Sequence, residues 1–278
     1  MLKFRRLFPR PCSIIGMIHV EALPGTPRYK GPVEKIIEDA VEEASIYAKY
    51  GADGILVENM HDIPYVKKKD LSPEIVTLMT RICTEVRKVV PGNTVCGVQI
   101  LAGCNREAIA VAKAAGFQFI RAEGFVFSHV ADEGFMDASA GTLLRYRRQI
   151  DAEDVLVFAD VKKKHSSHAI TSDVTLLETV KAAEFFLADG IILTGRATGE
   201  EANMQDLTEV RKCVAERLPV LIGSGVTLDN VGNYTAAADA LIVGSYLKTA
   251  GRWENSLDAH RVQALVEYLK SRQQQQSS

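Results

Sequence analysis

Short apolar segments alternate with longer amphipathic ones along almost the whole chain, and this alternation limits the fold more than any other feature. The apolar segments are rich in valine and isoleucine, which is typical of parallel strands covered on both faces. We predict strands at residues 13–20, 53–59, 94–100, 117–123, 155–161, 189–194, 219–223 and 239–244. The amphipathic segments predict helices at about 32–50, 73–90, 105–115, 140–150, 174–187, 206–217, 229–236 and 257–271. Because βαβ crossovers are right-handed, such units form either an open doubly wound sheet or a closed barrel.

A phrase that recurs before every second expected strand favours the barrel. Four segments share one order: small residues at the end of an expected helix, then an acid or a polar residue in its place, then an expected strand. They are "GADGILVEN", "AGFQFIRAEG", "LADGIILTG" and "AADALIVGS". Repeats of two βα units suit a barrel in which alternate strands fill alternate interior layers. No G-x-G-x-x-G follows the first strand, as a dinucleotide-binding sheet would require. We therefore predict an α/β fold, a single (β/α)8 TIM barrel over residues 13–271, with an N-terminal extension at 1–12 and a disordered polar tail at 272–278.

Composition excludes several classes of function. A formal net charge of −2 gives no basic field for nucleic acid, and no apolar run is long enough for membrane insertion. Five scattered cysteines without C-x-x-C are typical of reduced thiols in an intracellular protein, which predicts the cytoplasm or the mitochondrial matrix. The basic start "MLKFRRLFPRPC" has the charge of a mitochondrial presequence but is short, and we favour a frayed basic end.

Polar residues end nearly every expected strand, which predicts a functional site at the mouth of the barrel, where the carboxyl ends of the strands meet. Packing alone does not require polar groups there. His19, Glu21, Gln99 and Thr194 are the predicted substrate-binding residues among them.

Two Gly–Ser turns follow the last two expected strands, and we predict that they bind phosphate. Loops after strands seven and eight of such barrels often hold a phosphate, and glycine lets backbone N–H groups approach an anion closely. The helix expected at 229–236 would add partial positive charge at its N-terminus. The alternative is that the glycines only permit sharp turns. The predicted phosphate-binding residues are Gly223, Ser224, Gly225, Gly244 and Ser245, with Gly195 from the preceding strand end.

The segment "ADVKKKH" carries the predicted catalytic pair, Asp160 and Lys162. Alternation along a strand places both on the side facing the barrel axis, where Lys162 could transfer a proton, bind a substrate anion or form a Schiff base. A buried structural ion pair is the alternative, and Lys163 and Lys164 are expected to point outward or lie in the loop. Glu58 and Glu123 are alternative acid–base groups.

Arg121 is predicted to act as an electrophilic clamp. The acids Glu21, Glu58, Glu123 and Asp160 would repel one another at a common mouth, so Arg121, Lys162 and Arg196, or a bound Mg²⁺, must compensate them. We assign no metal site and require no cofactor, although Mg²⁺ stays open. The long segments 21–31 and 124–139 are candidate lids or subunit contacts.

Eleven blocks along the chain, among them "IGMIHVEALPGTP", "GADGILVENMHDIPY", "ADVKKKH", "TGRATG" and "PVLIGSGVTLDNV", resemble the BtpA/SgcQ family in order. That family is assigned to the ribulose-phosphate-binding barrel group, so the resemblance implies a barrel with phosphate loops. It also links the chain to cyanobacterial photosystem I biogenesis factors, to members from sugar-phosphate gene neighbourhoods, and to eukaryotic members described as mitochondrial.

Three functions are therefore open. The first is an enzyme that binds a phosphorylated small molecule, such as a sugar phosphate or a nucleotide-like compound, and performs lyase- or isomerase-type acid–base chemistry. The second is a non-catalytic assembly or stability factor that keeps a phosphate-ligand site. The third is a metal-dependent hydrolase. Self-association into a homo-oligomer is a further expectation, without an interface visible in the sequence.

Overall fold

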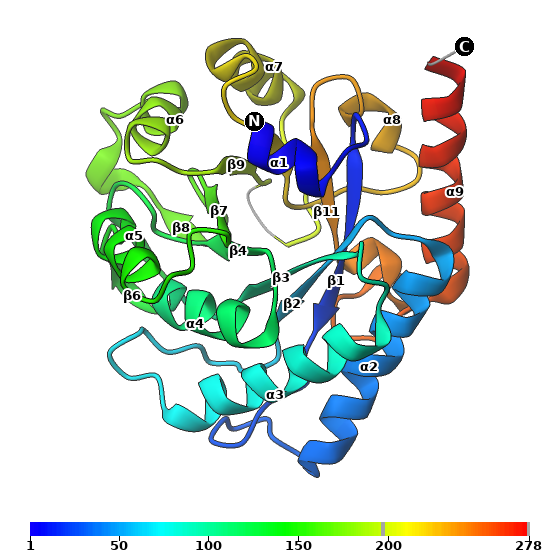
Figure 1. Cartoon of the computed structure of the whole chain (residues 1–278). Helices are drawn as coiled ribbons and strands as arrows, with labels where there is room; N and C mark the ends of the chain where they lie inside the picture. Colours follow the sequence, from blue (N-terminus) through cyan, green and yellow to red (C-terminus); the bar gives the residue numbers. More distant parts are fainter. Residues whose placement is uncertain (196–197, 277–278) are drawn as a thin grey trace.

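Eight parallel strands close into a barrel in the part of the chain that the computed structural model describes, residues 1–195 and 198–276 with side chains through Arg272 (Figure 1). Around the barrel the strand order is β1–β2–β3–β4–β7–β9–β10–β11, with β11 hydrogen-bonded back to β1. The predicted TIM barrel is confirmed, and all eight expected strands are present.

The barrel strands are β1 Ser13–His19, β2 Gly54–Glu58, β3 Val95–Gln99, β4 Phe119–Ala122, β7 Leu156–Asp160, β9 Gly190–Leu193, β10 Val220–Ile222 and β11 Ala240–Val243. The outer helices are α2 Val33–Tyr50, α3 Pro73–Val89, α4 Asn105–Ala115, α5 Ala140–Gln149, α6 Leu176–Phe185, α7 Met204–Val214, α8 Val231–Tyr234 and α9 Ala259–Gln276. The last helix thus continues beyond residue 271, where the sequence places a disordered tail. Nowhere in the described chain is a helix both long and apolar enough to cross a membrane.

The repeated phrase has a structural cause at the amino ends of the strands. In each repeat the side chain before the strand accepts a hydrogen bond from the backbone N–H at the start of the preceding strand. The side-chain oxygen thereby satisfies a buried backbone N–H group at the amino-terminal end of the barrel. The four bonds are Asp53 with Ile14 (2.9 Å), Gln118 with Cys96 (2.8 Å), Asp189 with Val157 (3.0 Å) and Asp239 with Val220 (2.8 Å).

Removal of one of these acceptors should destabilise the barrel without touching its mouth. Asp189 also forms an ion pair with Arg147 at 2.6 Å, and Val157 is fully buried. Asp189→Ala leaves a buried donor unsatisfied, so we expect a loss of about 2–3 kcal/mol in the free energy of unfolding, measured by urea denaturation. Asp154→Ala, which breaks only an exposed ion pair, is the matched control and should change it by under about 0.5 kcal/mol. Equal effects of the two substitutions would contradict this role.

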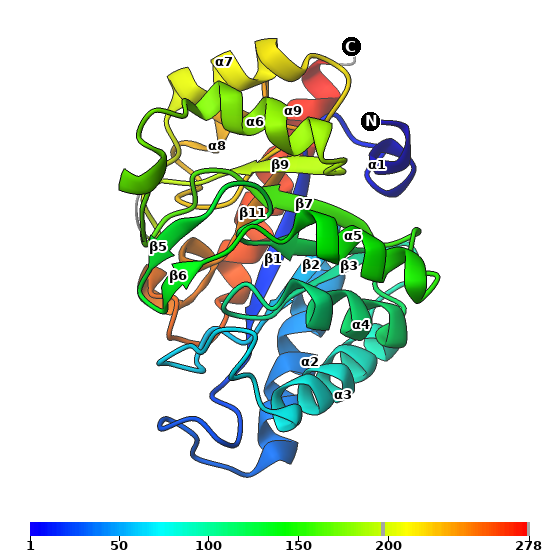
Figure 2. The same cartoon turned by 90° about the vertical axis from the view of Figure 1, so that its left-hand side faces the viewer.

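The N-terminal extension is an ordered part of the core, so the expectation of a frayed end is wrong. Residues Leu2–Leu7 form α1, whose Phe4, together with the following Phe8, is buried in the interior of the barrel. Phe4 packs edge-on against Phe158 with ring centroids 5.8 Å apart, and Phe8 packs against Phe119 at 6.2 Å. The helix lies at the opposite end of the molecule from β5 and β6 (Figure 2). It therefore closes the floor of the barrel.

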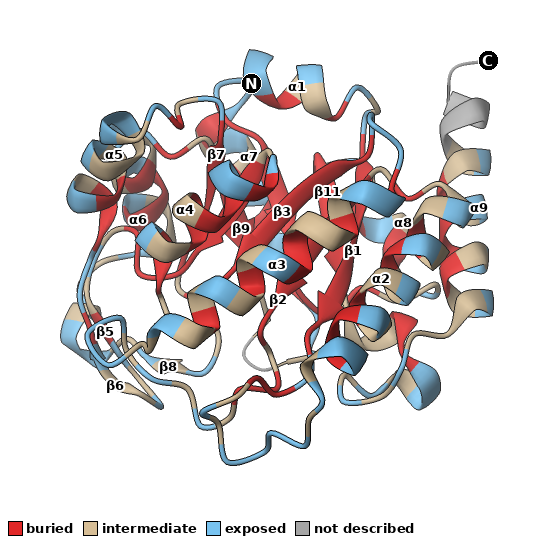
Figure 3. Cartoon of the chain, turned by 60° about the horizontal axis from the view of Figure 1, so that its bottom comes forward, coloured by how far each residue is buried: buried red, intermediate tan, exposed pale blue. Residues whose placement is uncertain are grey.

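The basic charge of the extension also has local partners. Arg5 forms an ion pair with Asp239, and Arg10 forms one with Asp53 at 3.1 Å. Both acids belong to the repeated phrase, so the extension is anchored to the acceptors that bind the strand starts. Figure 3 shows α1 across the end of the barrel away from the mouth loops.

The predicted lid segment 124–139 forms a hairpin beside the mouth. Its strands β5 His129–Ala131 and β6 Gly134–Met136 are antiparallel, and β5 also pairs with β8 Ser166–Ser167 from the loop after β7. The small sheet therefore ties the loop after β4 to the loop after β7, at the edge of the mouth (Figure 2).

Candidate functional site

A cavity of about 580 Å³ opens at the carboxyl ends of the strands, where the sequence predicts the site. Both Gly–Ser turns line it, and so do charged side chains from β2, β4 and the loop after β7. The predicted site residues on its wall are His19, Glu58, Gln99, Arg121, Glu123, Gly223, Ser224, Gly225, Gly244 and Ser245.

The two turns present backbone N–H groups that have no acceptor within the described chain. This holds for the N–H groups of Ser224, Gly225, Gly244 and Ser245 among the residues described. The N–H of Gly223 is different, because it donates to the Leu193 carbonyl at 2.7 Å and continues the sheet. Four such donors in residues that line one cavity can hold an oxyanion.

Two of the predicted phosphate glycines have a packing reason for lacking a side chain. A Cβ on Gly225 would lie 2.2 Å from the Glu200 carbonyl oxygen, and one on Gly195 would lie 2.4 Å from the same atom. Gly225 also has φ +70°. The N–H of Gly195 donates to Ser224 Oγ at 2.7 Å, and Gly195 is not part of the cavity wall. The tight-turn alternative therefore accounts for Gly195, while Gly225 serves the turn and still offers its N–H.

The helix after the first turn is shorter than expected. The single-turn helix α8 begins after Asn230, whose side chain accepts from the Thr227 N–H at 2.8 Å. With only one turn it carries little of the dipole that the expected helix would supply. An anion at this wall would therefore be bound by backbone N–H groups of the turns and not by a helix N-terminus.

Arg121 and Asp160 form a buried ion pair beneath the cavity. The Nε of Arg121 lies 3.0 Å from Asp160 Oδ2, and both side chains are buried. Asp160 does not line the cavity, so its carboxylate positions the Arg121 guanidinium from behind. This is the structural ion pair that the sequence left open, although its partner is Arg121 and not Lys162.

Glu58 is a buried carboxyl group at the end of β2 that lines the cavity. Burial raises the pKa of Glu58 to about 7, and the positive charges of Arg121 and Lys164 oppose that increase. A carboxyl group with a pKa near neutrality can serve as either a proton donor or a proton acceptor. Glu58 is thus suited to acid–base chemistry.

Three consecutive lysines lie in the loop after β7, and Lys162 does not face the barrel axis as the sequence predicts. The strand ends at Asp160 and Lys162 has φ +47°, so the alternation along the strand does not continue through it. The Nζ of Lys162 donates to the Thr171 carbonyl at 3.3 Å, beside a separate cavity of about 20 Å³. Lys163 is buried instead, with Nζ 3.2 Å from Glu123 Oε1.

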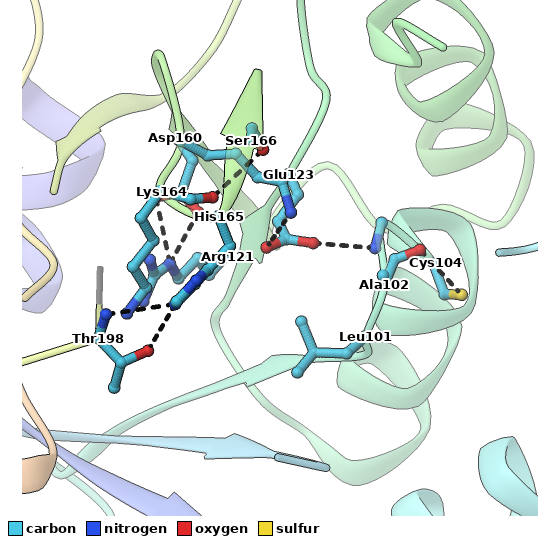
Figure 4. A network of polar contacts seen from close by, with 12 residues as sticks. Leu101, Ala102, Cys104, Arg121, Glu123, Asp160, Lys164, His165, Ser166 and Thr198 are labelled. Atoms are coloured by element: carbon cyan, nitrogen blue, oxygen red, sulfur yellow. Dashed lines mark hydrogen bonds and ion pairs between the residues drawn. The ribbon is translucent and has the colours of Figure 1, made fainter. Parts of the chain in front are cut away.

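Lys164 lies in the loop after β7, one of its two expected placements, but it lines the main cavity and does not point outward. Its side chain runs beside the Arg121 guanidinium (Figure 4). Desolvation and the charge of Arg121 lower the pKa of Lys164 to about 8. The next residue, His165, contacts Thr198 Oγ1 through Nε2 at 2.9 Å, which links the loops after β7 and β9 (Figure 4).

His19 is held as a neutral acceptor beside the second turn. Burial and the nearby Lys248 lower the pKa of His19 well below its ordinary value. Its Nδ1 lies 3.1 Å from the Trp253 carbonyl oxygen and donates to it when the ring is neutral. Nε2 is then an acceptor, on the side where a Cβ on Gly244 would lie 3.1 Å away.

The remaining predicted residues are placed as follows. Gln99 Oε1 is buried at the cavity wall without a hydrogen-bond partner in the described chain, as is Thr194 Oγ1 outside that wall. Glu21 lies away from the cavity wall and contacts His61 at 3.7 Å. Arg196 lies outside the described residues.

Sequence reasoning missed the apolar part of the wall. Tyr65 and Trp253 line the cavity from loops after β2 and β11, where no strand pattern places them. Among the described residues, no group of three or more histidine, cysteine, aspartate or glutamate side chains could hold a metal ion.

Sequence comparisons agree on one family along almost the whole chain. The BtpA family model matches residues 10–271. A Caenorhabditis elegans protein whose name places it in mitochondria is 47% identical over 261 residues, covering 93% of each chain. The photosystem I biogenesis protein BtpA of Synechocystis is 38% identical over 256 residues, covering 92% of this chain and 87% of its own.

Solved structures with the same fold are barrels of distant sequence. KGPDC from Streptococcus mutans in complex with D-R5P superposes with a TM-score of 0.59 at 10% identity, covering 94% of this chain and 99% of its own. Phosphoribosyl anthranilate isomerase from Thermus thermophilus has a TM-score of 0.55 at 13% identity, covering 93% and 98%. At such identities these matches establish the fold alone.

Proposed function

This chain belongs to the BtpA family, and we propose that it binds a phosphorylated small molecule and performs acid–base chemistry on it. One observation carries the proposal: the N–H groups of two Gly–Ser turns, without acceptors in the described chain, line the same cavity as Glu58 and Arg121. The turns supply donors for the phosphate, and the charged side chains supply the reacting groups. Lyase or isomerase chemistry on a sugar phosphate needs both features in one cavity.

Each group then has a role. The N–H groups of Ser224, Gly225, Gly244 and Ser245 hold the phosphate oxygens. Glu58 transfers a proton, because burial brings its pKa to about 7. Arg121, fixed by Asp160, stabilises negative charge that develops on a substrate oxygen.

A negative charge at the second turn should abolish phosphate binding. We expect Ser245→Asp to weaken binding of triose and pentose phosphates at least tenfold, because the carboxylate repels the phosphate to which the N–H groups donate. Ser245→Asn is the matched control of similar shape without the charge. Isothermal titration of both variants, with the dephosphorylated sugars as parallel ligands, measures the effect. Phosphate binding that survives Ser245→Asp would place the anion elsewhere.

A binding role without turnover is a second candidate, because the Synechocystis relative is named a photosystem I biogenesis protein. The two candidates differ in one measurement. An enzyme incorporates solvent deuterium into a bound sugar phosphate or converts it, whereas a binding module only shows ligand-dependent stabilisation. Nuclear magnetic resonance in D₂O with a panel of ketose and aldose phosphates separates them.

A further inference from the structure

We propose that the amine of Lys164 captures the carbonyl carbon of a phosphorylated aldehyde or ketone as a Schiff base inside the mouth cavity. This inference rests on the proposed phosphate site, which would hold the other end of such a molecule. It adds a covalent step and names the substrate class.

Three other lysines near the mouth are already engaged. Lys163 is paired with Glu123, and Lys162 donates to the Thr171 carbonyl. Lys248 is fully buried and pairs with Glu43 at 2.6 Å. The Nζ of Lys164 has no hydrogen bond or ion pair to any residue that the structure describes, although its side chain lines the cavity. A lysine that is free and faces a cavity can react with what the cavity holds.

The surroundings of Lys164 favour the uncharged amine, which is the form that attacks a carbonyl group. The nearby carboxylates of Glu58, Asp160 and Glu123 favour the charged form, but desolvation and Arg121 outweigh them. Desolvation and the Arg121 charge bring the pKa from 10.5 to about 8, which raises the uncharged fraction at neutral pH about 300-fold. Lys164 interacts electrostatically with six charged or titratable groups, which are Arg121, Glu58, Asp160, Glu123, His19 and His165.

Glu58 can supply the proton that the step needs. The Lys164 nitrogen attacks the carbonyl carbon, and its proton passes to the carbonyl oxygen to give a carbinolamine. The hydroxyl group then leaves as water with a proton from Glu58, and the products are an iminium ion and the Glu58 carboxylate. Glu58 lines the same cavity, and with a pKa of about 7 roughly half of it carries that proton at neutral pH.

The loop after β9 lies between the segment that carries Lys164 and the second Gly–Ser turn. His165 contacts Thr198 at 2.9 Å, and a Cβ on the neighbouring Gly199 would lie 4.0 Å from Ser245 Oγ. A short carbon chain with a phosphate at one end and a carbonyl group at the other suits this arrangement. Triose and pentose phosphates are of that class.

Reductive trapping tests the proposal on the full chain. Dihydroxyacetone phosphate with cyanoborohydride should add the mass of one reduced adduct per chain, measured by mass spectrometry. Peptide mapping should place that adduct on Lys164. Dihydroxyacetone, which lacks the phosphate, should react at least tenfold more slowly. The trapping rate should rise as the Lys164 amine loses its proton and fall as Glu58 loses the proton that releases water, so it should pass through a maximum between about pH 7 and 8. A surface lysine would instead keep rising towards 10.5.

Matched lysine variants identify the nitrogen. Lys164→Met and Lys164→Arg should each lose at least nine-tenths of the adduct, while Lys162→Met keeps it. Lys164→Arg retains the positive charge, so loss of adduct in a folded Arg variant separates the amine chemistry from a folding defect. An adduct that persists in both Lys164 variants, or that maps to another lysine, overturns the proposal.

Calorimetry with the same probe separates this proposal from the phosphate site. If dihydroxyacetone phosphate binds, and Ser245→Asp abolishes the binding, but no adduct forms, the Schiff base is refuted and the phosphate site stands. If an adduct forms on Lys164 equally fast with and without the phosphate, the phosphate site is refuted. If neither binding nor adduct occurs, both proposals fail.

Discussion

Glu58→Gln is expected to lower turnover of the phosphorylated substrate by about 10²- to 10⁴-fold while leaving the phosphate bound, because proton transfer by a positioned side chain contributes that much. Glutamine has the size of glutamate but cannot exchange a proton. The phosphate donors lie in the turns after β10 and β11, so the dissociation constant for inorganic phosphate should change little. Deuterium exchange into the bound sugar phosphate, followed by nuclear magnetic resonance, measures the loss.

The fold of the Glu58→Gln variant should survive, which keeps the result interpretable. The folded-state pKa of Glu58 is raised from 4.5 to about 7, so the folded protein holds a proton that the unfolded chain has released between these values. Stability from this group is therefore present at low pH and lost as pH rises through about 7. Glutamine removes that dependence, and above pH 7 the variant should be at least as stable as the parent. Undiminished exchange in a well-folded variant would exclude Glu58 as the proton-transfer group.

Glu58→Gln also tests whether Glu58 is the proton donor in formation of the Schiff base. If Glu58 supplies the proton that releases water, trapping on Lys164 should slow in this variant and recover partly at lower pH, where solvent can protonate the carbinolamine. The lysine variants remove the nitrogen itself, so their adduct is absent at every pH. The two sets of variants thus distinguish the acid from the nucleophile.

The barrel could be predicted from the sequence because its strands are apolar nearly throughout and its repeats mark strand starts. The acids of the repeat accept hydrogen bonds from strand N–H groups, as Asp53 does from Ile14. Their recurring position indicated a common role, but the sequence did not show which role. Backbone geometry limited the prediction of the site. Lys162 has φ +47°, and no feature of "ADVKKKH" announces that the strand ends two residues earlier. The period-two argument therefore selected Lys162 where the chain presents Lys164.

The floor of the barrel escaped prediction for a different reason. Phe4 and Phe8 have the i, i+4 spacing of one helix face, but the segment is too short and too basic for a core helix on its own pattern. Its stability comes from contacts distant in sequence, with Phe119, Phe158 and the acids Asp53 and Asp239. A local pattern cannot reveal partners more than a hundred residues away. Asp239 illustrates this, because Arg5 reaches it across 234 positions.

Removal of this floor should cause a large loss of stability. Phe4 is 1% and Phe8 0% exposed, and each Phe→Ala change in a core costs about 3–5 kcal/mol. Their rings are 4.9 Å apart, so the two losses are not additive, and we expect about 5–7 kcal/mol for the double variant. That approaches the whole stability of many domains. Urea denaturation followed by circular dichroism measures it.

Leu2→Ala is the matched control, because Leu2 lies on the same helix with 81% of its surface exposed. It should change the free energy of unfolding by less than about 0.5 kcal/mol.

A second readout tests whether the floor and the mouth act independently. Under native conditions the single variants Phe4→Ala and Phe8→Ala should bind phosphate like the parent, because the Gly–Ser turns lie at the other end of the strands. If the double variant unfolds at the same urea concentration as the parent, α1 is not part of the core, and the basic residues Arg5 and Arg10 need another explanation.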